Sequence, residues 1–538
     1  MTGVIELTRA ALRRDRGRFG VWALGLLVGA MVSAVNISTG YGDEAQRIAS
    51  LQVAIDNPAL LIGRGLPMGP GEGAFLFYTY GVVFGTAFAV FATFFAVRHG
   101  RAQEDDGTRE LVRAAATGRL AGLAATLTAG TVGTLGLAAA MAAGFVLGGA
   151  DPVGSLWAGV VCSLVAAVFL AVGALCGQLA PKARTASGLG AVAIAGFFVI
   201  RVIADVRAEI DPISLVGTPV WLGWLSPFSL ALIANPFGAV DLLPLTVLAA
   251  AAGVAGIGAF AVERRREFGA SLLTPKPGPA QAPASLGSPF RLALRLQRGT
   301  LAAMMVAGAA VGAFAAILAV LALGSSGQND AIRDLIADLV GQHGPLYDLL
   351  LSYVMVLVGE CAAIAGALVV LRARREEAAG NVELVRGTAT GAGRWLGSIL
   401  AVGWVSILLV LATAWVGAAT VYLAHGMGGW AVWQVLASSA AQVPATGLYL
   451  GVIALAFAAV PRLTSGVAWT ILALGVVLAE LGGRLGLPGW LIRVSPFMHT
   501  PLVTTASPAW GGAMVMSGIA VAAGALAVAV YRRRDLSP

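Results

Sequence analysis

Long apolar runs recur along the chain, and they constrain its fold more than any other feature. Each has about 20 residues or more, enough to cross the ~30 Å hydrocarbon core of a bilayer as an α-helix. We predict twelve such spans, at 19–39, 75–97, 120–148, 155–179, 186–205, 243–262, 300–323, 349–371, 396–424, 433–459, 465–481 and 510–531. With 58% hydrophobic and 12% charged residues, 538 residues cannot coat a soluble globule. The sequence therefore predicts an all-α polytopic membrane protein.

The placement of the basic residues predicts how these spans cross the membrane. Most of the 35 Lys and Arg fall at the two ends of the chain and in alternate loops. Because positive residues are enriched in cytoplasmic loops, we expect a multi-pass protein of the cell membrane with both termini in the cytoplasm. This orientation signal explains the net charge of +8, so we expect no nucleic-acid partner.

Two polar stretches, 98–119 and 372–395, carry nearly the same motif after the second span of each half. Gly107 and Gly380 lie 273 residues apart, and the other matched pairs keep that offset. The repeated positions are Glu104, Gly107, Glu110, Leu111, Arg113 and Thr117 in the first stretch and Glu377, Gly380, Glu383, Leu384, Arg386 and Thr390 in the second. A short helix here can place leucine on one face and arrange its charges for ion pairs with a partner. Two copies in register favour a docking site, and a solvated connector is the alternative.

Further matches divide the chain into two parallel repeats. Ser-Pro-Phe recurs at 226–228 and 495–497, and three arginines recur at 264–266 and 532–534. Because six is an even number of spans, both copies have one orientation in the membrane. We predict six-span repeats at 1–270 and 291–538, joined by a Pro-rich cytoplasmic linker at 271–290.

Shorter elements are expected at both ends of the spans. Each repeat opens with a basic segment, such as 4–18, which predicts an interfacial helix, with a disordered tail as the alternative. The Pro- and Trp-containing segments 206–242 and 482–509 predict short re-entrant or interfacial helices. Arg201 and Glu480 lie near the outer ends of their spans, where snorkelling explains them.

The repeated motif resembles the signature of ABC-2 type transporter permeases. In that family a coupling helix between the second and third spans carries Glu-x-x-Gly-Thr-x-Glu-x-Leu, a small-residue turn and Arg. The first copy matches through Thr108 and Arg119, and the second has Asn381 in place of Thr and ends at Arg394. The familiar proline is replaced by Ala116 and Ala389. The fused twelve-span layout is similar to the tetronasin-type exporters of polyketide antibiotics in actinobacteria.

This resemblance implies a fold, partners and a function. The fold would be type V ABC exporter-like. Two copies of a separate ATPase subunit, holding ATP and Mg, would clamp the two coupling helices. The chain would be the permease that moves hydrophobic compounds, such as antibiotics, other drugs or lipids, out of the cell. Its own residues agree with this division, because a Walker A loop requires Gly-Lys-[Ser/Thr] and both lysines, Lys182 and Lys276, follow proline. We therefore expect no catalytic, cofactor or metal site here.

Two groups of residues are candidates for the transport path. Glu360 lies in the middle of a span, where an ionised carboxylate costs roughly 2.5–3.5 kcal/mol, so it is expected to face protein or a cavity. It is either a cavity residue or a neutral acid that bonds a neighbouring helix. The second group is aromatic, and helix packing is the alternative to substrate contact for it. Its members are Tyr80, Phe84, Phe88, Phe91 and Phe95, with Tyr353 in the second half.

A proton-coupled transporter of the major facilitator type is the alternative function. That class also has two parallel six-span halves, and Glu360 could carry its proton. Its loop after the second span is short and has a Gly-x-x-x-Asp-Arg-x-Gly-Arg-like pattern. Residues 98–119 lack that pattern, so the sequence favours the ATP-driven permease.

Overall fold

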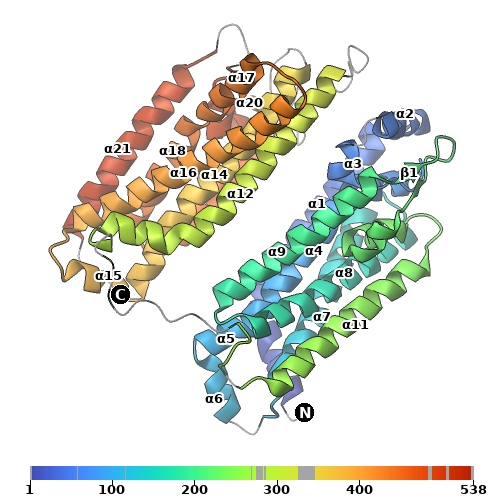
Figure 1. Ribbon diagram of the computed structural model, residues 1–538, viewed down its shortest axis with the longest axis horizontal. Coiled ribbons are helices and arrows are strands. Elements are labelled where there is room, and N and C mark those ends of the chain that lie inside the picture. Colours follow the sequence, from blue (N-terminus) through green and yellow to red (C-terminus); the bar gives the residue numbers. More distant parts are fainter. Residues whose placement is uncertain are drawn as a thin grey trace. The chain divides into compact units, whose positions relative to one another are not determined.

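The computed structural model consists of two compact helical units, Met1–Gly278 and Pro279–Pro538 (Figure 1). The boundary between them falls inside the Pro-rich stretch 271–290. The structure describes residues 3–56, 59–114, 117–267, 269–273, 281, 283, 286–324, 346–480, 482, 487–503 and 508–534.

Long apolar helices build both units. The first unit contains α1 (Val4–Gly40), α4 (Glu72–His99), α7 (Ala121–Leu147), α8 (Pro152–Leu179), α9 (Ala183–Val206) and α11 (Leu242–Arg265). The second contains α12 (Pro289–Gly324), α14 (Leu346–Ala378), α16 (Ala392–Ala424), α17 (Gly429–Ala440), α18 (Val443–Ala459), α19 (Thr464–Glu480) and α21 (Gly511–Arg533). Within the described residues, eleven helices are long and apolar enough to cross a membrane. This confirms the predicted all-α polytopic class.

The span predicted at 465–481 is short for a helix that crosses a bilayer. It corresponds to α19, which has 17 residues. At 1.5 Å per residue it is about 25 Å long, slightly less than the ~30 Å hydrocarbon core. Helix α17 joins α18 to supply the span predicted at 433–459, with Pro444 in the first turn of α18.

Small residues set the distances between helices. A Cβ atom at Gly312 of α12 would collide with the Ala414 carbonyl of α16, and one at Gly417 of α16 with the Ala309 carbonyl of α12. In the first unit a Cβ at Gly144 of α7 would collide with the Leu27 carbonyl of α1. Close approach at small residues is how helices associate without a hydrophobic driving force in lipid.

The first helix of each unit is longer than predicted. The basic segment 4–18 and the following span form one helix, α1, and α12 likewise begins at Pro289 and continues through its span. The sequence contains no proline between residues 4 and 40 to break α1. The separate interfacial helix predicted here is therefore the first part of a continuous one.

Short elements cap the ends of the units that are distant from the repeated motifs. In the first unit these are α2 (Glu44–Asp56), α3 (Ala59–Arg64), the pair β1 (Glu209–Ile210) and β2 (Gly217–Thr218), η1 (Trp221–Leu225) and α10 (Pro227–Ile233). In the second they are α20 (Gly489–Ile492) and η3 (Pro496–His499). Arg201 does not snorkel, because it is fully buried, pairs with Asp205 at 3.3 Å and donates to the Leu61 and Ile62 carbonyls of α3.

Candidate docking site

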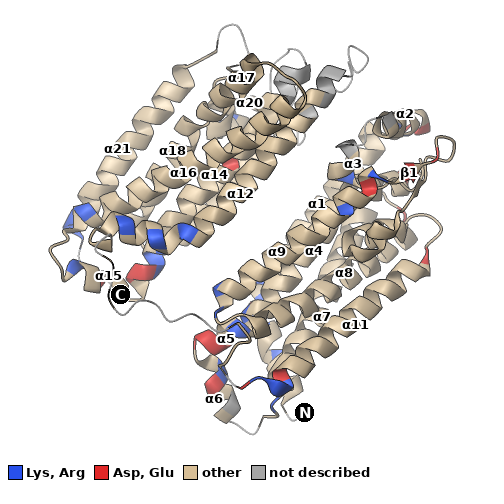
Figure 2. Cartoon of the chain, viewed as in Figure 1, with Lys and Arg blue, Asp and Glu red and all other residues tan. Residues whose placement is uncertain are grey.

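Each repeated motif lies at one end of its own unit, which we call the loop end. The first motif forms α5 (Arg101–Asp105) and α6 (Thr108–Ala114), and the second forms the end of α14 and α15 (Asn381–Arg386). In each unit most of the basic side chains lie at this end, and in the first unit a smaller group lies near α3 (Figure 2). The end of α11 lies at the loop end of the first unit, since Arg119 donates to the Arg266 carbonyl at 2.9 Å. The first part of α12 lies at the loop end of the second unit, since Arg372 donates to the Leu296 carbonyl at 2.7 Å.

The two motif glycines adopt the same unusual backbone conformation. Gly107 and Gly380 each have φ of +75°, and each directly precedes the motif helix. A Cβ at either would meet no described atom within 4 Å. Glycine is therefore required here by the left-handed backbone and not by lack of space. Beside Gly107, hydrogen bonds from Thr108 to the Asp106 carboxylate lower the pKa of Asp106 and close the turn into α6.

The motif exposes the same pair of side chains in both units. Leu111 of α6 and Leu384 of α15 are each 77% exposed. The preceding residues, Glu110 and Glu383, are exposed as well. An apolar side chain and an adjacent acid, each presented twice at equivalent positions, form a surface that a partner can contact.

The first motif glutamate points into its unit. The Glu104 side chain is only 3% exposed and pairs with Arg101 at 3.0 Å, Arg109 at 3.2 Å and Arg266 at 2.6 Å. Glu263 of α11 completes this Glu104 cluster, with Arg266 at 3.1 Å and Arg109 at 3.4 Å. Although burial alone would lower the pKa of Arg266, its bonds to Glu104 and the charges of Glu104 and Glu263 raise it.

Glu377 is the matching buried acid in the second unit. Its carboxylate pairs with Arg534, accepts a hydrogen bond from the Tyr531 hydroxyl at 3.0 Å and lies 3.9 Å from Arg374. These four residues are the Glu377 cluster. Both motif glutamates were grouped with the docking residues from sequence, and the structure turns both inward. They fix the loop to the end of the last helix in their own unit.

Sequence reasoning missed the partners of these glutamates. Arg266 and Arg534 each end the three-arginine run that follows the last span of its half, and those runs were interpreted only as an orientation signal and as a mark of the repeat. Arg101 and Arg374, which lie 273 residues apart, were missed too. Arg101 donates to the Pro181 carbonyl and Arg374 to the Pro461 carbonyl at 2.8 Å. Repetition in both halves was the signal that could have found all four, at an offset of 273 for Arg101 and Arg374 and of 268 for Arg266 and Arg534.

The remaining motif residues have local roles. Thr117 Oγ1 donates to the Val112 carbonyl at 3.0 Å and closes the end of α6. Thr390 accepts a hydrogen bond from Thr388 at 3.1 Å in the turn after α15. Arg386 is half-buried. The side chain of Arg113 lies outside the described residues.

The transport-path candidates lie inside their units. Glu360 of α14 is 8% exposed, and its Oε1 atom has no hydrogen-bond partner among the described residues. Phe84, Phe88 and Phe91 are buried in the first unit, where Phe91 packs against Phe19 at 5.3 Å. Two tyrosines are half-buried: Tyr80, which donates to Asn36 Oδ1 at 3.1 Å, and Tyr353, which packs against the core of the second unit. Contact with a transported compound stays a prediction for all of them.

Two helical units share the same loop motif, and their described residues include eleven potential membrane spans, which defines a multi-pass membrane protein. Residues 286–532 match the family model for the C-terminal domain of the multidrug efflux system permease Rv1217c. The chain is also 30% identical over 551 residues to the multidrug efflux system permease protein Rv1217c of Mycobacterium tuberculosis (strain ATCC 25618 / H37Rv), covering 99% of this chain and 95% of that protein. The chain therefore belongs to the Rv1217c family of multidrug efflux permeases.

Proposed function

We propose that this protein is the membrane-spanning subunit of an ATP-driven exporter of hydrophobic compounds such as antibiotics, other drugs or lipids. A separate ATPase, present in two copies and holding ATP and Mg, would dock on α6 of the first unit and α15 of the second. Both termini and both loop ends would face the cytoplasm. The observation that carries this proposal is the pair of leucines, Leu111 and Leu384, exposed to the same extent at equivalent positions.

The buried clusters supply a route for force. A displacement of α6 would act on α11 through Arg109 and Glu263, and a displacement at the end of α14, just before α15, would act on the end of α21 through Glu377 and Arg534. Removing one partner of a buried ion pair costs about 3–5 kcal/mol, so these links resist separation. The end of the last long helix in each unit would therefore move with the motif stretch of that unit.

Family membership does not favour the proton-coupled alternative, since the related protein is named as a permease of an efflux system. The ATP-driven proposal also accounts for the surface motif, which a proton-driven carrier does not need. Glu360 stays a candidate for contact with the transported compound.

Uptake of a hydrophobic drug into inverted membrane vesicles tests the proposal. The vesicles contain this protein with a candidate ATPase, and they are energised by ATP or by a proton gradient. The test variant is Leu111→Arg with Leu384→Arg. The matched control is Ile213→Arg, which alters a side chain 91% exposed in segment 206–242.

We expect uptake that requires ATP, survives a protonophore, is lost in the double variant and persists in Ile213→Arg. Uptake that follows the proton gradient without the ATPase would overturn the proposed energy source. ATP-driven uptake that survives in the double variant would show that the ATPase docks elsewhere.

A further inference from the structure

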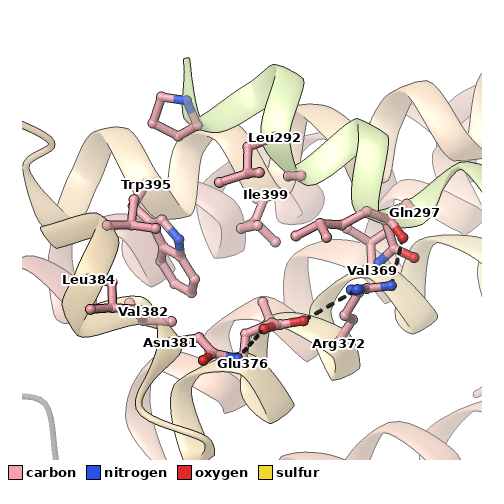
Figure 3. Close-up of a pocket in the computed structure, with 15 residues that line it drawn as sticks. Leu292, Gln297, Val369, Arg372, Glu376, Asn381, Val382, Leu384, Trp395 and Ile399 are labelled. Atoms are coloured by element: carbon pink, nitrogen blue, oxygen red, sulfur yellow. Dashed lines mark hydrogen bonds and ion pairs between the residues drawn. The ribbon is translucent and has the colours of Figure 1, made fainter. Parts of the chain in front are cut away.

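A cavity of about 230 Å³ lies beside α15 in the second unit (Figure 3). Four helices enclose it: α12, α14, α15 and α16. Its walls are mostly apolar and include Leu292, Leu296, Val382, Val385, Trp395 and Ile399. Because Val382 and Val385 belong to α15, any occupant touches the motif helix directly.

The first unit has a cavity of about 180 Å³ at the equivalent place. At several equivalent positions its walls carry a polar residue or glycine where the walls of the second unit's cavity carry an apolar side chain. Arg14 stands for Leu296, Arg109 for Val382, Gly122 for Trp395 and Thr126 for Ile399. The exchanges at 109 and 122 are linked, since a Cβ at Gly122 would lie 2.8 Å from Arg109 Nη2 and the guanidinium would have to shift. The repeat thus keeps a cavity but changes its chemistry.

One polar group at the edge of the apolar cavity is incompletely satisfied. Arg372 donates through Nη1 to the Leu296 carbonyl at 2.7 Å and pairs through Nη2 with Glu376 at 3.3 Å. Its Nε atom is buried and has no hydrogen-bond partner among the described residues. Glu376 also accepts a hydrogen bond from the neutral Asn381 amide at 2.7 Å, and its charge is compensated by Arg372. The Arg372 side chain is 23% exposed and lines the cavity, so its guanidinium can receive an acceptor at the cavity edge, where carboxylate or phosphate is the favoured group.

We propose that this cavity binds a small acidic amphiphile, with its aromatic or acyl body against Leu292, Trp395 and Ile399 and its carboxylate or phosphate on Arg372. A dry cavity of about 150 Å³ is known to hold benzene, so this one admits a two-ring aromatic body or a short length of acyl chain. The bound compound fills the space between α12 and α15 and fixes the position of the motif helix. Leu384 also lines the cavity, so the site adjoins the proposed docking surface, but binding of the amphiphile does not require an ATPase.

The test uses the full chain, purified and placed in phosphatidylcholine nanodiscs. The probe is a naphthoic acid that carries a diazirine, and its methyl ester is the uncharged comparison. After photolysis the labelled residues are located by mass spectrometry. Ala293→Trp fills the cavity, Arg372→Met removes the guanidinium, and Ala11→Trp is the matched control because Ala11 occupies the equivalent wall of the first unit's cavity.

We expect the acid to label α12 and α15 at least tenfold more than the ester does. Ala293→Trp should abolish this labelling, Ala11→Trp should preserve it, and Arg372→Met should reduce labelling by the acid to the level of the ester. Competition by phosphatidic acid in the nanodisc would identify a lipid as the occupant, and competition only by free naphthoic acid would identify a soluble amphiphile.

Equal labelling by acid and ester in the unaltered protein would overturn the proposal, even if a variant failed to fold. Labelling spread along all membrane helices and unaffected by Ala293→Trp would overturn it as well, since that pattern reports partition into lipid alone.

Discussion

The Glu104 and Glu377 clusters both join the motif loop to the end of the last long helix in their unit, but different residues make the two joins. In the first unit the buried acid lies among three arginines and a second glutamate. In the second, Val382 occupies the position of Arg109, and Tyr531 occupies that of Glu263. Tyr531 bonds Glu377 and stacks on Trp395 at 5.4 Å.

This difference shows which parts of the repeat are exchangeable. Arg109 and Glu263 carry opposite charges, so replacing both with Val and Tyr leaves the net charge of the buried set unchanged. Exchange of only one would leave an uncompensated charge inside the unit. The exposed Glu-Leu pair, the left-handed glycine and the Glu–Arg link to the last helix are common to both units.

The largest expected effect comes from Glu104→Gln, which leaves Glu263 as the carboxylate shared by Arg109 and Arg266 and leaves Arg101 paired with the partly exposed Asp105. We expect a loss of about 3–5 kcal/mol in the free energy of unfolding. Glu377→Gln should cost less, about 1–3 kcal/mol, since its arginine partners are 16% exposed whereas those of Glu104 are 3% to 7% exposed. Unfolding in detergent measures both, and equal losses would remove the distinction between the clusters.

The paired exchange can be tested by making the first cluster resemble the second. Arg109→Val and Glu263→Tyr should each be destabilising alone, and the double variant should recover part of the loss. We expect a coupling free energy of about 0.5–3 kcal/mol from a double-mutant cycle. If the two changes in the free energy of unfolding were strictly additive, the inference that Val and Tyr replace Arg109 and Glu263 as a compensating pair would be wrong.

Substitution of the motif glycine should destabilise both units to a similar extent, whereas substitutions in the two clusters should differ in their effect. Gly107→Ala and Gly380→Ala should each cost about 1–2 kcal/mol, because alanine is strained at positive φ. Asn at either position should cost less. Gly17→Ala is the control, since Gly17 lies within α1 in open space, and it should be neutral or stabilising. Thermal unfolding of the variants measures the contrast.

The smallest effect on stability is expected at the exposed leucines. Leu111→Ala and Leu384→Ala should each change the free energy of unfolding by less than about 0.5 kcal/mol. Binding of the ATPase should nevertheless weaken in both, and most in the double variant. Co-purification with the ATPase measures this. A large loss of stability would show that these side chains pack within the protein.

The spans and the position of the motif loops were accessible from sequence because they depend on long apolar runs. Such runs are recognised without knowing their neighbours. The continuous α1 was not predicted, since a change from basic to apolar composition does not itself end a helix. Arg201 was misjudged for a related reason, because its acceptors belong to α3, a short helix that the sequence did not reveal.

The inward direction of the motif glutamates could not be read from their spacing. Glu104 and Glu110 are both acids in one polar loop, yet the first is buried and the second is exposed. Only the tertiary position of Arg266, distant in sequence, decides between them. Repeated residues in a motif therefore include those that hold it in place as well as those that present it.

The unbroken α1 also has a mechanical consequence. Its 37 residues form a rod about 55 Å long at 1.5 Å per residue. A Cβ at Gly3, just before the rod, would lie 3.1 Å from Thr117 at the end of α6, and Asn36 near the other end bonds Tyr80. A rod of this length converts each degree of tilt into about 1 Å of travel at its far end. A displacement of α6 that tilted α1 would therefore also move the far end of the unit.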